Sequence, residues 1–284
     1  MNKIKIFIEL TRLDKPIGFM LLFWPSLWGL TIAYNENQNI QKYFLYIIYF
    51  FLGSVLMRSA GCIVNDIFDK NFDKRISRTK KRPLAAGKIS IINSLVYTIL
   101  LCGLAFLILI QFNNLTVLLG LLSIPFAFSY PLMKRFIYWP QLFLGITFNF
   151  GLIMAWTAVN NYISLEIIVV YFAAIFWTLG YDTIYGYQDI ADDEIIGLKS
   201  TSIKFKKNPK KFLICCYLLS IFLLIIFGML NENKLYYFIF LIFPIMHYLY
   251  QINKLNIRDS NKCLEVFRSN NFFGFLLFLN FLLT

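Results

Sequence analysis

The sequence of 284 residues has few charged side chains, a single histidine and only five cysteines. Charged residues make up 15% of it, against about 25% in an ordinary globular chain. Hydrophobic residues make up 59%, where globular chains have roughly 45–50%. Such a chain cannot cover its apolar residues with a water-facing surface. The shortage of charge therefore excludes an ordinary soluble domain and predicts a protein that lipid surrounds over much of its surface.

The cysteines and the histidine do not form the pattern of a metal or disulfide site. The cysteines are odd in number, stand mostly in apolar runs and show no CxxC spacing, so we expect them to act as small hydrophobic side chains. They are Cys62, Cys102, Cys215, Cys216 and Cys263. His247 has no second histidine with which to build a site, and we expect it to be packed or hydrogen-bonded inside a helix.

Nine apolar stretches approach the roughly 17–25 residues that a helix needs to cross a bilayer. They are apolar on every face, as in LYIIYFFLGSVLM, whereas strands of a membrane barrel alternate polar and apolar residues. We therefore predict an all-α polytopic membrane protein with about nine transmembrane helices, forming a single membrane-embedded domain over residues 1–284. The expected spans are Ile17–Tyr34, Phe44–Val64, Ile89–Gln111, Leu115–Tyr130, Trp139–Val159, Leu165–Tyr185, Phe212–Leu230, Leu235–Gln251 and Asn270–Thr284.

The net charge of +12 would suggest a nucleic-acid partner if the basic residues were spread evenly. Instead, 24 of the 27 Lys and Arg residues lie in five connections that alternate with nearly uncharged ones. Those five are residues 3–15, 70–88, 134–135, 199–211 and 254–268. Because cytoplasmic loops are rich in Lys and Arg, we place the N-terminus in the cytoplasm and expect membrane lipids, not nucleic acid, as the surroundings. No signal or transit peptide precedes the first span, which favours a bacterial inner membrane.

Acidic residues are scarce, yet eight of the fifteen gather in two short windows. Residues four apart advance by only about 40° around a helix, so Asn65, Asp69 and Asp73 are expected to form one stripe. Asp189 and Asp193 are expected to form a second, with Asp182 on the same face two turns deeper. An isolated acidic residue at the end of a helix could simply face water. Two equivalent clusters beside an apolar core point instead to cations that offset their charge.

Carboxylates together with an amide oxygen suit Mg²⁺, which proteins usually hold with one or two carboxylates plus substrate phosphates. Two facing clusters would hold Mg²⁺ ions on either side of a diphosphate inside a central cavity open to the cytoplasmic side. Arg82, Lys134 and Arg135 would take the remaining negative charge. Arg58 precedes Asn65 by seven residues and lies on the same face about 10 Å deeper. It is expected to bind the carboxylate of a small ligand or to pair with Asp182, and the two roles are compatible.

Both acidic windows carry a family resemblance. MRSAGCIVNDIFDKNFDKRISRTKKRPLAAGKIS resembles the first aspartate-rich region of the UbiA-type membrane prenyltransferases, and YDTIYGYQDIADDEIIGLKSTSIKF resembles the second. The stretches LDKPIG, YPLMKRF and GLKST are similar to the branch that prenylates 4-hydroxybenzoate in ubiquinone biosynthesis. The resemblance implies an enzyme that binds Mg²⁺ and a polyprenyl diphosphate. The residues that match the metal and diphosphate motifs are Asn65, Asp69, Asp73, Asp189 and Asp193, and those expected at the phosphates are Arg82, Lys134 and Arg135.

The implied reaction moves the polyprenyl group to the ring carbon ortho to the hydroxyl of 4-hydroxybenzoate. Mg²⁺ and the basic residues would stabilise the departing diphosphate, and Asp182 or Asp189 would help to remove the ring proton. Aromatic side chains would shield the allylic cation from water. The candidates are Phe68, Tyr130, Phe148, Tyr181 and Tyr185.

Two alternatives stay open on the sequence alone. A transporter or lipid carrier with Arg58 and Asp182 as a gating pair would also have intramembrane charges, although such proteins show repeats and broken spans near mid-membrane. Prenyl transfer to another acceptor, such as haem, a naphthoate or a chlorophyllide, would use the same acidic motifs.

Overall fold

The computed structural model describes residues 3–34, 39–76, 79–231 and 235–283, and these ranges contain α-helices and no strands. The all-α prediction is therefore confirmed. The helices are α1 (Lys3–Thr11), α2 (Ile17–Ala33), α3 (Ile40–Asp73), α4 (Ile91–Leu109), α5 (Asn114–Phe136), α6 (Pro140–Phe148), α7 (Phe150–Asn160), α8 (Leu165–Gly186), α9 (Ile190–Ile196), α10 (Thr201–Lys204), α11 (Pro209–Leu230), α12 (Leu235–Phe240), α13 (Ile242–Lys254), α14 (Ser260–Arg268) and α15 (Asn270–Phe281).

The expected count of nine spans is not confirmed. Over the described residues, seven helical stretches are long and apolar enough to cross a membrane, namely α3, α4, α5, α6 with α7, α8, α11, and α12 with α13. The first expected span corresponds to α2, which stops after 17 residues because Tyr34 turns to an extended backbone. The ninth corresponds to α15, which has only 12 residues. Thr284, its expected end, lies outside the described residues. The seven stretches nevertheless identify a membrane protein.

Two helices extend well past the expected ends of their spans, and both extensions carry charged residues. Helix α3 continues beyond Val64 to Asp73, so the first acidic stripe lies on one unbroken helix of 34 residues. Helix α5 continues beyond Tyr130 to Phe136 and has Lys134 and Arg135 in its last turn. The hydropathy of the sequence marks the lipid-facing part of a helix and not the charged turns that follow it.

Polar side chains fix where several helices begin. Ser90 accepts a hydrogen bond from the backbone N–H of Asn93 at 3.1 Å at the start of α4. Asn113 accepts one from Thr116 at 3.0 Å at the start of α5. Each side chain satisfies a backbone donor that has no partner within the helix, which is why Ser and Asn are favoured at these positions.

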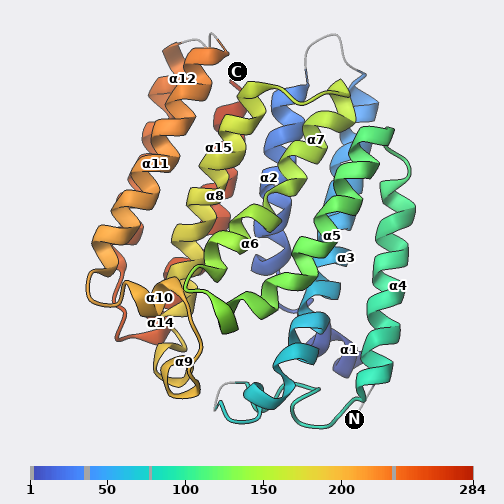
Figure 1. Cartoon of the computed structure of the whole chain (residues 1–284). Coiled ribbons are helices and arrows are strands. Elements are labelled where there is room, and N and C mark those ends of the chain that lie inside the picture. Colours follow the sequence, from blue (N-terminus) through green and yellow to red (C-terminus); the bar gives the residue numbers. More distant parts are fainter. Residues whose placement is uncertain (1–2, 35–38, 77–78, 232–234, 284) are drawn as a thin grey trace.

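Helix α8 runs through the interior and α4 lies at the periphery (Figure 1). Trp177 of α8 is fully enclosed, with its ring 4.9 Å from Trp28 of α2 and 5.2 Å from Phe273 of α15. Ile92 and Ile99 of α4 are about 70% exposed and face outward to lipid. The apolar core therefore lies among α2, α8 and α15.

The segments that carry most of the basic residues lie at one end of the helix bundle. Figure 1 shows α1, α9, α10 and α14 at its lower end, while α12 and the end of α15 lie at the upper end. The sequence placed these basic connections on one membrane face, and the arrangement of the helices agrees with that grouping. Arg78 and Lys234, which belong to the charge pattern, lie outside the described residues.

Candidate active site

A cavity of about 1030 Å³ runs from the basic end of the bundle past the middle of the helices, as far as Tyr49, Phe112 and Gly120. Most of its lining comes from helices α2 to α8, and the segments that contain Arg82 and α9 also contribute. Of the twelve predicted site residues, all but Arg135 line it: Arg58, Asn65, Asp69, Asp73, Arg82, Tyr130, Lys134, Asp182, Tyr185, Asp189 and Asp193. Residues from distant parts of the chain thus meet at one cavity.

The first wall is the acidic stripe of α3. Asp69 is only 2% exposed, and its Oδ2 accepts a hydrogen bond from the Lys134 ammonium of α5. Among the described residues, its other oxygen, Oδ1, has no hydrogen-bond partner although it is buried. Buried carboxylate oxygens are costly without a partner, so Oδ1 of Asp69 is suited to a cation or a donor that enters the cavity.

The end of the same stripe binds an arginine from the loop that follows α3. Nη1 of Arg82 lies 2.8 Å from Oδ2 of Asp73 and 3.2 Å from Oδ1 of Asp66. Asp66 does not line the cavity, and it also accepts a hydrogen bond from Arg12. Asp66 therefore holds the two arginines in place at the edge of the cavity.

Arg12 is a cavity residue that the sequence reasoning missed, because it was counted only as a marker of the cytoplasmic face. It follows α1 in a left-handed conformation, with φ of 57°, which turns the chain toward α2. Burial lowers the pKa of the guanidinium, but the negative charge of neighbouring groups, among them Asp66, raises it above its ordinary value. The available signal was the position of Arg12 beside the LDKPIG stretch that carries the family resemblance.

The second wall differs from the prediction in one respect. Helix α8 ends at Gly186, and Asp189 is the residue that precedes a separate short helix, α9. The expectation that Asp182 lies on the same helical face as Asp189 is therefore wrong, because the helix is interrupted between them. Asp189 and Asp193 do lie one turn apart, since the Asp193 N–H donates to the Asp189 carbonyl at 2.8 Å. All three still line the cavity.

Backbone hydrogen bonds fasten α9 to the basic end of α5. The Lys199 N–H donates to the Lys134 carbonyl at 2.8 Å, and the Leu198 N–H donates to the Asp193 carbonyl at 2.9 Å. Gly197, with φ of 80°, supplies the left-handed turn that ends α9. These bonds place Lys134 next to both acidic regions.

The deeper part of the cavity contains Arg58. Its guanidinium lies 5.5 Å from the centre of the Phe148 ring, over the ring face. Gly18 of α2 makes room for it, because a Cβ at that position would lie 2.9 Å from Nε of Arg58. Within the described part of the chain, no salt bridge of 4.0 Å or less joins Arg58 to Asp182. The geometry leaves the guanidinium accessible to a ligand.

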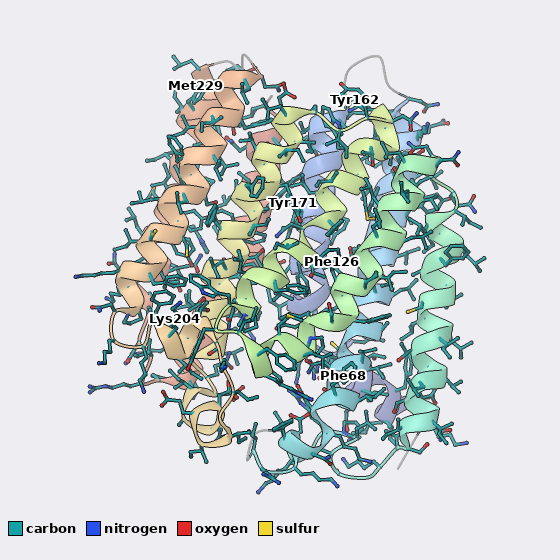
Figure 2. All side chains as sticks on the ribbon, in the orientation of Figure 1. Phe68, Phe126, Tyr162, Tyr171, Lys204 and Met229 are labelled. Carbon is teal, nitrogen blue, oxygen red and sulfur yellow. The ribbon has the colours of Figure 1, made fainter. Side chains whose placement is uncertain are left out.

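Two predicted residues lie outside the cavity. Arg135 donates to the carbonyl of Phe68 at 2.7 Å and stacks 5.0 Å from the Phe72 ring, and its Nη2 is 3.9 Å from Asp69. Phe68 itself is 40% exposed at the lower end of the bundle (Figure 2), so its assignment as a shield for the cation is wrong. It lies on the outward face of α3. The other predicted aromatic residues, Tyr130, Phe148, Tyr181 and Tyr185, do line the cavity.

The donor set can be compared with the needs of Mg²⁺. No three His, Cys, Asp or Glu side chains come close enough to hold a metal ion by themselves in the ranges that the structure describes. The carboxylates stand on two walls instead. Lys134 and Arg82 contact those of the first wall, where Oδ1 of Asp69 accepts no hydrogen bond from the described residues. Mg²⁺ is usually held by one or two carboxylates, waters and substrate phosphates. The residues therefore fit Mg²⁺ that is bound together with a phosphate ligand.

Comparisons with known proteins agree with the resemblance noted in the sequence. The model of the UbiA prenyltransferase family matches residues 22–282. The mitochondrial 4-hydroxybenzoate polyprenyltransferase of Bos taurus is 40% identical over 98% of this chain and 74% of its own. The 4-hydroxybenzoate octaprenyltransferase of Pseudomonas fluorescens is 38% identical over 98% and 92%.

The fold is also shared with a solved structure. A UbiA homolog from Archaeoglobus fulgidus, bound to GPP and Mg²⁺, superposes with a TM-score of 0.68. The match covers 96% of this chain and 99% of that one, at 16% sequence identity. At that identity the likeness establishes the common fold.

Proposed function

Because this chain belongs to the UbiA prenyltransferase family, we propose that it transfers a polyprenyl group from a polyprenyl diphosphate to 4-hydroxybenzoate. The product is 3-polyprenyl-4-hydroxybenzoate, an intermediate of ubiquinone biosynthesis. The observation that carries the proposal is a single cavity in which two acidic walls, lysine and arginine meet at the basic end and aromatic residues line the deeper part. The two named relatives, each 38% identical or more, support 4-hydroxybenzoate as the acceptor.

The donor diphosphate lies at the basic end, between Asp69 and Asp73 on one wall and Asp189 and Asp193 on the other, with Asn65 as a further oxygen ligand. Mg²⁺ held by these carboxylates would supply positive charge that stabilises the diphosphate as a leaving group. Lys134 and Arg82 already lie at the carboxylates and take up the charge that develops on the leaving group. Asp66 orients Arg82 for this purpose.

The acceptor lies deeper, beside Arg58. The guanidinium forms a bidentate contact with the carboxylate of 4-hydroxybenzoate, which leaves the ring carbon ortho to the hydroxyl directed toward the donor. The faces of Tyr130, Phe148 and Tyr185 stabilise the allylic cation and exclude water. Asp182 or Asp189 accepts the proton that the ring carbon loses after the new C–C bond forms.

The orientation in the membrane follows from the charge distribution. The basic end of the bundle faces the cytoplasm, so the N-terminus and the diphosphate site lie on the cytoplasmic side of a bacterial inner membrane. Soluble 4-hydroxybenzoate enters from that side, and the polyprenyl chain remains among the membrane lipids.

The direct test is product formation in membranes that contain the protein. We expect 4-hydroxybenzoate, a polyprenyl diphosphate and Mg²⁺ to give the 3-prenylated acid, detected by mass spectrometry, and chelation of Mg²⁺ to stop the reaction. Membranes without the protein serve as the control. If 4-hydroxybenzoate stays unmodified while a naphthoate is prenylated under the same conditions, the family assignment stands and the acceptor is wrong.

A further inference from the structure

A second cavity, of about 370 Å³, lies apart from the first, where α11 begins and where the chain passes from α13 to α14. Neither the proposed donor site nor the proposed acceptor site includes any of its residues. Its lining consists of Lys207, Asn208, Pro209, Lys210 and Lys211 on one side and Leu255, Asn256, Ile257 and Arg258 on the other. We call it the basic cavity.

The basic cavity has four cationic side chains and no acidic one in its lining. Across the ranges that the structure describes, none of these four forms a salt bridge. The nearest acid in the sequence, Asp259, accepts hydrogen bonds from the N–H groups of Asn261 and Lys262 at the start of α14. Its carboxylate is therefore used as a helix cap. The positive charge of the basic cavity therefore favours binding of an anion.

The backbone adds to this positive potential. Helix α11 has 22 residues, and its N-terminal end carries the positive pole of the helix dipole. Asn208, which precedes it, provides no side-chain cap. On the opposite side, the Arg258 N–H donates to the side-chain oxygen of Asn256 at 3.1 Å, which fixes the turn that presents Arg258. Two separate segments thus converge on the cavity.

The surface next to the basic cavity is apolar and faces outward. Ile214, Leu218 and Phe222 follow Lys210 at four-residue intervals along α11 and are 40%, 64% and 59% exposed. The buried side of α11, which includes Leu213 and Tyr217, packs on α8. Figure 2 shows nitrogen-tipped side chains projecting at the lower end of α11, beside the labelled Lys204. A cationic pocket therefore continues directly into a lipid-facing stripe.

We propose that the basic cavity binds the phosphate headgroup of an anionic phospholipid, whose acyl chains lie along this stripe of α11. A phosphate at the cytoplasmic interface matches the four cations in sign, and hydrocarbon chains match the exposed Ile214, Leu218 and Phe222. Free phosphate would match the charge of the basic cavity, but it would leave the apolar stripe of α11 without a partner. The lipid links the start of α11 to the α13–α14 connection and so stabilises the C-terminal half of the bundle.

The test compares lipid binding to purified full-length protein in neutral detergent, by native mass spectrometry. Phosphatidylglycerol, phosphatidylcholine and inorganic phosphate are titrated separately. The test variant is Lys210→Gln/Arg258→Gln, and the matched control is Lys3→Gln/Lys5→Gln, which removes two exposed charges near the same end of the bundle. We expect the apparent affinity for phosphatidylglycerol to fall by roughly thirtyfold in the test variant and to stay within about twofold in the control. Prenyl transfer in neutral detergent should be unchanged in both, which shows that they are folded.

Three results would overturn the proposal. Equal losses of affinity for phosphatidylglycerol in the test and control variants would mean that lipid binding depends only on the overall charge at that end of the bundle. Wild-type protein that binds phosphatidylcholine as tightly as phosphatidylglycerol would remove the role of the headgroup charge. Inorganic phosphate that binds as tightly as the lipid would assign the cavity to a soluble anion.

Discussion

Asp69 combines a buried position, a lysine partner and one oxygen, Oδ1, that accepts no hydrogen bond from the described residues and lies 3.9 Å from Nη2 of Arg135. If this carboxylate holds Mg²⁺ against the diphosphate, Asp69→Asn removes a ligand charge while it keeps the size of the side chain. We expect kcat to fall by at least about a hundredfold, the range seen when one electrostatic contact to a transition state is lost. Product formation measured against Mg²⁺ concentration is the readout.

Asp192→Asn is the matched control for this change. Asp192 belongs to the second acidic window but does not line the cavity, so its substitution should leave the Mg²⁺ dependence unchanged. If Asp69→Asn has wild-type activity at every Mg²⁺ concentration, the carboxylate does not take part in metal binding, and the first wall has another role.

Gly18 sets the position of Arg58 because a methyl group there would meet the guanidinium. Gly18→Ala should therefore displace Arg58 and raise KM for 4-hydroxybenzoate about tenfold, with KM for the donor changed by less than about twofold. Arg58→Ala should also raise KM for 4-hydroxybenzoate, and by more than Gly18→Ala does. Steady-state kinetics with each substrate varied in turn gives both values.

Gly103→Ala is the control for Gly18→Ala, since a Cβ at that position in α4 meets nothing within 4 Å. The opposite pattern, a higher KM for the donor and an unchanged KM for the acceptor, would mean that Arg58 contacts the diphosphate.

The residues of the candidate site were found from spacing where the helix is continuous. Asn65, Asp69 and Asp73 share a face because α3 runs unbroken to Asp73. Arg12 was missed because a basic residue near a membrane face is usually explained by topology alone. Its role depends on a left-handed turn after α1 and on contact with Asp66, and neither follows from hydropathy or charge.

At the level of helices, α2 and α7 approach so closely that only glycine fits at their crossing. A Cβ on Gly29 would overlap the backbone carbonyl of Leu152. Gly29→Ala should therefore push the two helices apart and lower the unfolding free energy by about 1–3 kcal/mol, as overpacking does. Thermal unfolding in detergent should show a lower Tm.

A glycine-to-alanine substitution where no neighbour is close should have the opposite effect and raise the unfolding free energy. Gly103→Ala adds a better helix former where nothing is crowded, which stabilises a helix by about 0.5–1 kcal/mol. A Tm that falls equally in both variants would show that loss of glycine itself, and not contact with Leu152, destabilises the bundle.

Besides Arg135 and Phe68, which lie outside the cavity, the connection between α8 and α9 was predicted incorrectly. Asp182 and Asp189 are seven residues apart, which would place them on one face if the helix continued. Gly186 marks its end, and a glycine late in a helical pattern is a known signal for a terminus. The count of nine spans stays unconfirmed because α2 and α15, with 17 and 12 residues, are the shortest of the helical stretches that correspond to expected spans.

For the whole molecule, composition and charge pattern were sufficient to predict an all-α membrane protein with its basic connections at one end. These properties follow from the requirement that lipid surrounds apolar side chains and that backbone groups pair within helices. The meeting of α3, α5, α8 and α9 at one cavity did not follow from the sequence, because helix packing is not encoded in hydropathy. The resemblance of the two acidic windows to one family supplied that information.

The orientation of the bundle has a test that is independent of activity. In a variant whose five native cysteines are replaced by alanine, a single cysteine is introduced at Tyr162, between α7 and α8, or at Lys262 of α14. Both positions are exposed, and they lie at opposite ends of the molecule (Figures 1 and 2). In right-side-out vesicles of the inner membrane, we expect a membrane-impermeant maleimide to label Tyr162→Cys directly and Lys262→Cys only after detergent is added. The reverse labelling would place the basic end outside the cytoplasm, against the enrichment of Lys and Arg in cytoplasmic loops, and would put the diphosphate site on the wrong side of the membrane for a donor made in the cell.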